Sequence, residues 1–129
     1  MICKCVDTTF LIDLLRDEEG AVEKAEELDE FGETVTTEIN VFEVVFGIYL
    51  SRSVNRKKRL KEVEMLFNRL NIFPFDHASA IKAGKILGEL VRKGMGIDSL
   101  DGMVAAIALT QGCNVIVTRN VKHFERIEG

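Results

Sequence analysis

The chain has little of several residues on which whole classes of protein depend. Its 129 residues include no tryptophan, one tyrosine and one proline. Aromatic side chains for stacking on nucleic-acid bases are therefore in short supply. With one proline and no low-complexity tract, a disordered linker or tail is not indicated. A hydrophobic content of 47% over this length instead predicts a single domain, residues 1–129, with a real core.

The cysteines are too few and too unevenly spaced to predict a covalent framework. Cys3 and Cys5 are separated by one residue, and Cys113 stands alone. Because the count is odd and no Cys-x-x-Cys pair occurs, neither a disulfide framework nor a thiolate zinc site is indicated. We expect the cysteines to be buried thiols on strands.

Long apolar runs are also missing. No stretch approaches the roughly 18 uncharged apolar residues that a membrane span needs. Asp7, Asp13 and Asp17 interrupt the N-terminus before the apolar core of a signal peptide could form. We therefore expect a cytoplasmic protein with no membrane partner.

The charge balance leaves two kinds of site open. The net charge is −4, from 17 basic and 21 acidic residues, and does not by itself indicate binding to nucleic acid. An acidic excess also fits a cluster of carboxylates that a divalent cation neutralises. Nucleotide hydrolysis is disfavoured, because no phosphate-binding GxxxxGK loop occurs.

What the chain does have is an alternation of short apolar strands with helical patterns. Thr36 or Thr37 and Asp76 are candidate helix caps, and Gly94 and Gly112 are candidate stops. The expected strands are residues 2–6, 33–36, 72–73, 114–117 and 126–127, and the expected helices are residues 8–16, 21–31, 38–51, 54–70, 77–93 and 99–111. This alternation predicts an α/β fold, with a mainly parallel sheet of four or five strands and helices on both faces.

Four polar residues occur where a strand ends or where the pattern is otherwise apolar. Asp7 ends the first strand, and Asn120 follows the last clear one. Glu43 lies within the apolar stretch VFEVVF, and Asp101 lies within DSLDGMVAAIAL. Burying an ionised carboxylate without a partner is costly. Ligands bind parallel sheets beyond the carboxyl ends of the strands, so we expect three of these four side chains to meet there.

Plainer interpretations of the same residues stay open. Glu43 could be an exposed residue of an amphipathic helix, and residues 118–120 could be a polar loop. Asp98 or Ser99 could cap the helix that follows, with Asp101 favoured at its positive end. Such a cap does not exclude a ligand role for Asp101.

The chemistry of the four residues favours a hard divalent cation. Carboxylate and amide oxygens suit Mg²⁺ or Mn²⁺, and no set of cysteines and histidines favours zinc. Carboxylates held close together also repel one another unless a cation is present.

Four motifs, taken in order, resemble a PIN domain, and most closely the VapC-like ribonuclease toxins of prokaryotic toxin–antitoxin pairs. They are VDTTFLIDLL at the start, TEINVFEVVFGI in the third helix, LDGMVAAIAL late in the chain and VIVTRNVKHF near its end. Each motif alone is weak, but together they cover nearly the whole chain. The resemblance implies a three-layer α/β/α sandwich around a mainly parallel sheet.

The resemblance also implies catalytic residues. Asp7, Glu43 and Asp101 match the three acids that hold the metal, and Asn120 takes the fourth catalytic position, where aspartate is common. Asparagine keeps an oxygen there but loses a charge, which bears on the binding of a second metal.

Further positions match around those four. Thr8 and Thr118 match hydroxyl positions beside the site, and Asp98 matches a position that is often acidic or polar, so we expect them as auxiliaries. Arg119 and Lys122 flank the site and are the expected contacts to RNA phosphates.

The implied activity is Mg²⁺- or Mn²⁺-dependent hydrolysis of RNA phosphodiester bonds, leaving a 5′-phosphate and a 3′-hydroxyl. The cation would lower the pKa of the attacking water. The implied partners are RNA, an antitoxin protein and a second copy of the chain. The basic run that begins at Arg52 is either a solvated helix face or an edge that contacts phosphates.

Two other classes compete with this interpretation. A non-catalytic PIN-like domain that binds a metal or a partner is kept open by Asn120. A phosphoacceptor regulatory domain needs an aspartate that closes a middle strand and a lysine that closes a late one. Asp76 is a poor match to the first, and Arg119 does not replace the second.

Overall fold

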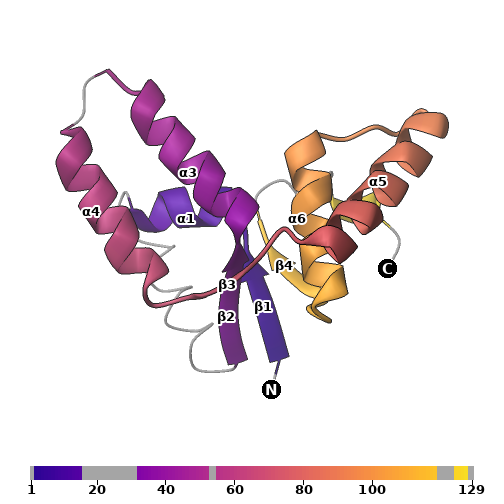
Figure 1. The fold of residues 1–129 in the computed structure, drawn as a ribbon, viewed down its shortest axis with the longest axis horizontal. Helices are drawn as coiled ribbons and strands as arrows, with labels where there is room; N and C mark the ends of the chain where they lie inside the picture. The colour runs from indigo at the N-terminus through magenta and orange to yellow at the C-terminus, as the bar shows by residue number, and fades with distance from the viewer. Residues whose placement is uncertain (1, 16–31, 53–54, 119–123, 128–129) are drawn as a thin grey trace.

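The computed structural model describes residues 2–15, 32–52, 55–118 and 124–127 (Figure 1). Its elements are β1 (Ile2–Val6), α1 (Thr8–Leu15), β2 (Gly32–Thr37), α3 (Glu38–Leu50), α4 (Arg56–Phe67), β3 (Asn71–Phe73), α5 (His77–Arg92), α6 (Ser99–Thr110) and β4 (Val115–Val117). The helix expected at residues 21–31 lies outside this description. None of the described helices is long and apolar enough to cross a membrane.

The strands form one parallel sheet in the order β3-β2-β1-β4. Lys4 of β1 lies opposite Thr34 of β2 on one side and Val115 of β4 on the other. The chain therefore proceeds from β1 outward to β2 and β3, and β4 is added on the opposite side of β1. Strand order reverses between β1 and β4, which is where parallel sheets bind ligands. The predicted α/β fold with a parallel sheet is confirmed.

Side chains of β1 point alternately into two helical layers. Val6 packs with Phe10 and Val44, on the face covered by α1, α3 and α4. Cys5 faces the other way and packs with Val104 of α6. Helix α5 lies outside α6, and the two share a further apolar cluster. Figure 1 shows these two groups of helices on either side of the sheet, which is the expected three-layer sandwich.

Local signals set the ends of several helices. Thr37 and Asp76 cap α3 and α5, each in a capping box with the residue three positions later. Gly94 and Gly112 follow α5 and α6 with φ angles of 69° and 74°, in the left-handed region that favours glycine. The predicted caps and stops at these positions are confirmed.

The strand expected at residues 126–127 is wrong. Phe124 and Glu125 are helical, and Arg126 lies in a turn. The N–H of Ile127 donates to the carbonyl of Phe124 at 3.1 Å, and Arg126 donates to the carbonyl of Gly96 at 3.0 Å. These local and side-chain bonds take the place of a ladder, so the described sheet has four strands.

The expectation of three unlinked thiols is also wrong. Cys3 and Cys113 form a disulfide between positions 110 residues apart, with their Cα atoms 5.3 Å from each other. The bond arises because β4 lies directly beside β1, which brings Cys113, two residues before β4, next to Cys3. The odd cysteine count is accounted for by Cys5, which is buried and free.

Gly102 sets how closely α6 packs on α5, and its replacement tests that contact. A Cβ atom at this position would lie 2.4 Å from Leu87 Cδ2 and 2.7 Å from its Cγ. We expect Gly102→Ala to lower the free energy of unfolding by about 1–3 kcal/mol, because Leu87 must move. In Gly84→Ala the added carbon meets nothing within 4 Å, so helix propensity should raise stability by up to about 1 kcal/mol. Urea denaturation of both variants would show this difference, and equal effects would contradict it.

The cysteine arrangement predicts a definite pattern of thiol reactivity. Burial, followed by the charge of Asp7, raises the pKa of the Cys5 thiol to about 12. Because the thiolate is the reactive form, the native protein should show no thiol that reacts rapidly with an aromatic disulfide reagent at pH 8. Denaturation without reductant should release one thiol, and denaturation after reduction should release all three. Three reactive thiols in the unreduced, denatured protein would contradict the Cys3–Cys113 bond.

Candidate metal and nuclease site

The carboxylate of Asp7 is buried at the point where strand order reverses. Its backbone N–H donates to the carbonyl of Val117 at 2.9 Å, so the end of β4 positions it directly. Oδ1 accepts from the N–H of Thr8 at 2.7 Å and from Asn40 Nδ2 at 3.1 Å. Oδ2 accepts from Thr118 Oγ1 at 2.7 Å. With 1% of its surface exposed, Asp7 is held by donors from three segments of the chain.

Glu43 lies on α3, close to the start of α1. Its Oε1 accepts a hydrogen bond of 3.0 Å from Thr8 Oγ1. The side chain is half-buried, which differs from the alternative of an exposed residue on an amphipathic helix. The hydroxyl of Thr8 therefore connects the glutamate of α3 to the residue that follows Asp7.

The pKa of Glu43 is affected by the other acidic residues near it. Burial raises its pKa above the usual value, and the negative charges of Asp7, Asp101 and Asp98 raise it further. The hydrogen bond from Thr8 acts in the opposite direction. Acids from the end of β1, the middle of α3 and the start of α6 thus share one electrostatic neighbourhood. We call Asp7, Glu43, Asp98 and Asp101 the acidic cluster.

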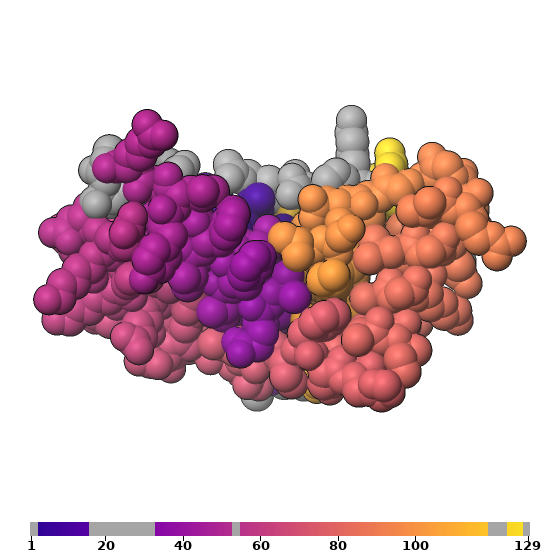
Figure 2. All heavy atoms as spheres, turned by 45° about the horizontal axis from the view of Figure 1, so that its top comes forward, coloured from indigo at the N-terminus to yellow at the C-terminus, as the bar shows by residue number. Residues whose placement is uncertain are grey.

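The two aspartates at the start of α6, Asp98 before the helix and Asp101 in its first turn, differ in burial. Asp101, in the first turn of α6, is 6% exposed. Asp98 is exposed and caps the helix, and its Oδ1 accepts from the N–H groups of Leu100 at 2.9 Å and Asp101 at 3.4 Å. The capping interpretation of Asp98 is confirmed. In Figure 2, α3 (purple) adjoins α6 (orange), and part of the N-terminal segment (indigo) is visible between them.

The two hydroxyl residues expected beside the site, Thr8 and Thr118, also differ in burial. Thr8 begins α1 and is buried, whereas Thr118 follows β4 and is half-buried. Both contact the acidic cluster through the hydrogen bonds given above. Asn120, Arg119 and Lys122 lie outside the described residues, so their predicted roles stay predictions.

Asn40 was not predicted as a site residue, yet it contacts two members of the site. Its Nδ2 donates to Asp7 Oδ1 at 3.1 Å and to Thr8 Oγ1 at 2.9 Å. A signal was present in the sequence, because Asn40 precedes Glu43 by three residues and both lie on one side of an apolar helix. The apolar surroundings point to burial, but they do not identify the partner.

The donor atoms of the cluster fit a hard divalent cation better than any other group. Within the described ranges, no three histidine, cysteine, aspartate or glutamate side chains are already grouped around one metal position. The carboxylates of Asp7, Glu43 and Asp101 supply oxygen ligands only, which suits Mg²⁺ or Mn²⁺. Their mutual repulsion at Glu43 is a charge imbalance that a bound cation would offset.

Two curated relatives are similar over much of the chain. A tRNA(fMet)-specific endonuclease VapC from Shigella flexneri is 28% identical over 124 residues, which cover 96% of this chain and 91% of the relative. A protein of the same name from Salmonella typhimurium is 36% identical over 91 residues, which cover 70% of this chain and 67% of the relative.

A solved structure shares the fold along the whole chain. The structure of DNA-bound VapBC from Salmonella typhimurium matches with a TM-score of 0.86 and 29% identity, covering 100% of this chain and 95% of that one. The family model of the PIN domain matches residues 4–129, and so includes most of β1, both helices that carry the acidic cluster, and β4. Because that match extends through every element that builds the site, this chain belongs to the PIN domain family.

Proposed function

We propose that the protein is an endoribonuclease that hydrolyses RNA phosphodiester bonds with Mg²⁺ or Mn²⁺, and that it is the toxin of a toxin–antitoxin pair. The observation that carries this proposal is the hydrogen bond from Thr8, which follows the buried Asp7, to Glu43, whose pKa is raised by burial and then by the charges of Asp7 and Asp101. The endonuclease relatives from Shigella and Salmonella support the reaction and the class of substrate. The catalytic unit comprises residues 1–129.

The acidic cluster has distinct proposed roles. Asp7, Glu43 and Asp101 hold the cation, and Asp98 adds negative charge at the exposed edge of the site. Thr8 and Thr118 fix the carboxylates of Glu43 and Asp7 through their hydroxyl groups. When bound, the cation supplies positive charge to the phosphate and acidifies the attacking water. Asn120 completes the site as the fourth catalytic residue.

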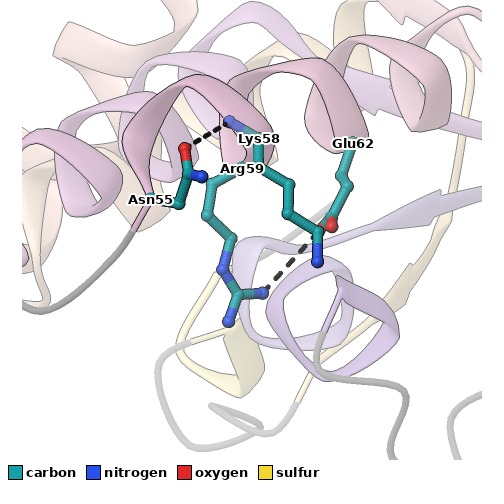
Figure 3. A network of polar contacts seen from close by, with 4 residues as sticks. All are labelled: Asn55, Lys58, Arg59 and Glu62. Atoms are coloured by element: carbon teal, nitrogen blue, oxygen red, sulfur yellow. Dashed lines mark hydrogen bonds and ion pairs between the residues drawn. The ribbon is translucent and has the colours of Figure 1, made fainter.

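The residues of this chain also position the substrate. Arg119 and Lys122 are the proposed phosphate contacts next to the cation. The start of α4 offers a second, more distant contact, because Lys57 and Lys58 are exposed there. The charge of the neighbouring Arg59 is partly offset by Glu62, whose carboxylate lies 3.7 Å from the guanidinium group (Figure 3). The first turn of α4 carries no acidic residue, although the helix dipole favours acids there. A role in binding phosphates accounts for this arrangement.

The proposed protein partners are an antitoxin and a second copy of the chain. Phe42, Phe46 and Tyr49 of α3 are 52%, 53% and 55% exposed, and form an apolar stripe at helical spacing. Exposed aromatic stripes of this kind are typical of protein interfaces. The VapBC complexes among the solved structures support an antitoxin partner.

We also propose a cytoplasmic location. There the reduction potential of the Cys3–Cys113 pair would decide whether the pair is a disulfide or two thiols.

The second candidate function is a non-catalytic PIN-like domain that binds a metal or a partner. It is favoured by Asn120, which lacks the charge of the aspartate common at that position. Metal binding by a folded chain that cuts no RNA would select this candidate.

Cleavage of a labelled structured RNA tests the nuclease directly. We expect cutting in Mg²⁺ or Mn²⁺, none in EDTA, and a rate at least about 100-fold lower for Glu43→Gln and for Asp101→Asn, because each removes a proposed ligand charge. Glu89→Gln removes an exposed carboxylate of α5 and serves as the matched control with an unchanged rate. Cutting that survives both ligand substitutions in folded, antitoxin-free protein would contradict the assignment of the site.

Salt-dependent binding tests the second phosphate contact. We expect Lys57→Gln combined with Lys58→Gln to weaken binding of single-stranded RNA and to reduce the slope of log K against log salt by about 0.7 for each lost contact. Lys85→Gln, an exposed lysine of α5, is the control for a change in total charge. If the double substitution leaves the slope unchanged, the start of α4 is a solvated face.

A further inference from the structure

We infer that Asn40 is a positioning residue for the proposed nuclease site, because its side-chain amide fixes the hydrogen-bond direction of Thr8 and orients both Asp7 and Glu43. The inference rests on the proposed function and extends it to a residue that is not itself a metal ligand. Asn40 is 0% exposed, so these contacts are made away from water.

The oxygen of the Asn40 amide is identified by a backbone donor. Oδ1 lies 3.2 Å from the N–H of Thr37 and 2.7 Å from Thr37 Oγ1. A backbone N–H can only donate, so the atom facing it must be the acceptor of the amide. Thr36 Oγ1 is also near, at 3.1 Å. The end of β2 therefore determines which way the amide points.

The other end of the amide must then be the NH₂ group, with two protons to donate. One lies toward Asp7 Oδ1 at 3.1 Å and the other toward Thr8 Oγ1 at 2.9 Å. Because Thr8 Oγ1 accepts from Asn40, its own proton is left for Glu43 Oε1, 3.0 Å away. One amide thus supplies a donor to one proposed ligand directly and directs a donor to another through Thr8.

An asparagine is the side chain that this position requires. Aspartate has the same shape and would keep the acceptor contacts to Thr37, but it has no donor for Asp7 or Thr8 and adds a charge beside Asp7. Alanine would lose both sets of contacts. In the described part of the protein, no buried side-chain nitrogen or oxygen lacks a hydrogen-bond partner, so losing the contacts of Asn40 would leave its buried partners with fewer hydrogen bonds.

Ser79 provides a matched control for the structural role of Asn40. Both residues occupy the third position of a capping box, Asn40 in α3 and Ser79 in α5, and both are 0% exposed. Ser79 bonds only with Asp76 in the described contacts, far along the chain from the acidic cluster. A purely structural role predicts the same consequences for both positions.

The experiment combines kinetics, metal binding and unfolding of the full chain. We expect Asn40→Ala and Asn40→Asp to lower kcat for RNA cleavage about 10- to 100-fold with a smaller change in KM, and Asn40→Ala to weaken Mn²⁺ binding by a similar factor in calorimetry. Ser79→Ala should lower Tm while leaving kcat and Mn²⁺ affinity unchanged. Equal kcat for wild type and Asn40→Asp would overturn the inference, even if Asn40→Ala does not fold.

A second measurement needs neither metal nor substrate. Hydrogen exchange of the Asn40 side-chain NH₂ group, assigned by its loss in Asn40→Asp, should be much slower than that of Asn55, which is exposed, and Thr8→Val should accelerate it. Fast exchange in the wild type would overturn the inference whether or not the protein cuts RNA. A wild type that cuts RNA normally, with Asn40 variants that match it, would remove the inference and leave the proposed function intact.

Discussion

The hydrogen bond from the Asp7 N–H to the carbonyl of Val117, at 2.9 Å, is the contact on which the site depends. It joins the end of the first strand to the end of the last, on the two sides of the point where strand order reverses. Thr118 then lies within reach of the Asp7 carboxylate, and α1 begins immediately after it. Because the bond is made by backbone atoms, the sheet sets the position of this carboxylate and side-chain packing only refines it.

Placing charged groups at this point has a cost that the surrounding residues reduce. Asp7 is nearly fully buried and accepts hydrogen bonds from Thr8, Asn40 and Thr118. Glu43 receives one hydrogen bond and is otherwise subject to repulsion and burial, both of which raise its pKa. Such an arrangement of carboxylates is electrostatically unfavourable, and the divalent cation proposed for this site would offset the repulsion. The same arrangement accounts for the concentration of polar groups in an otherwise apolar interior.

Two exposed surfaces lie outside the acidic cluster: an aromatic stripe on α3 and a basic first turn of α4. The aromatic stripe of α3 leaves Phe42, Phe46 and Tyr49 about half exposed, although their helical spacing alone is equally typical of a core. The first turn of α4 gathers basic residues in a chain whose net charge is −4. Leu50, at the end of α3, follows Glu43 by seven residues, so the end of this helix lies about 10 Å from the glutamate of the site. An RNA that contacted both the acidic cluster and the first turn of α4 would extend over several nucleotides.

Much of the fold, and the burial of the candidate residue Asp7 at a strand end, could be predicted from the sequence, because the signals are local. The apolar strand before Asp7, the caps at Thr37 and Asp76 and the glycine stops at Gly94 and Gly112 each depend on a few neighbouring residues. The motifs around the acidic residues also lie within short windows, and the family model confirms the family that they resemble.

The tertiary structure decided what depends on pairing between distant segments. Cys3 and Cys113 meet because β4 lies beside β1, and no count of cysteines reveals which strands are neighbours. The exposure of the α3 aromatics depends on which face the sheet covers. The role inferred for Asn40 depends on the direction of one amide, set by the N–H of Thr37. By itself the sequence determined most of the described elements, their order and the residue types of the candidate site, because those follow from local periodicity and chemistry. Strand neighbours, burial and hydrogen-bond direction were decided only by the folded chain, because each is a relation between residues that the sequence leaves far apart or does not orient.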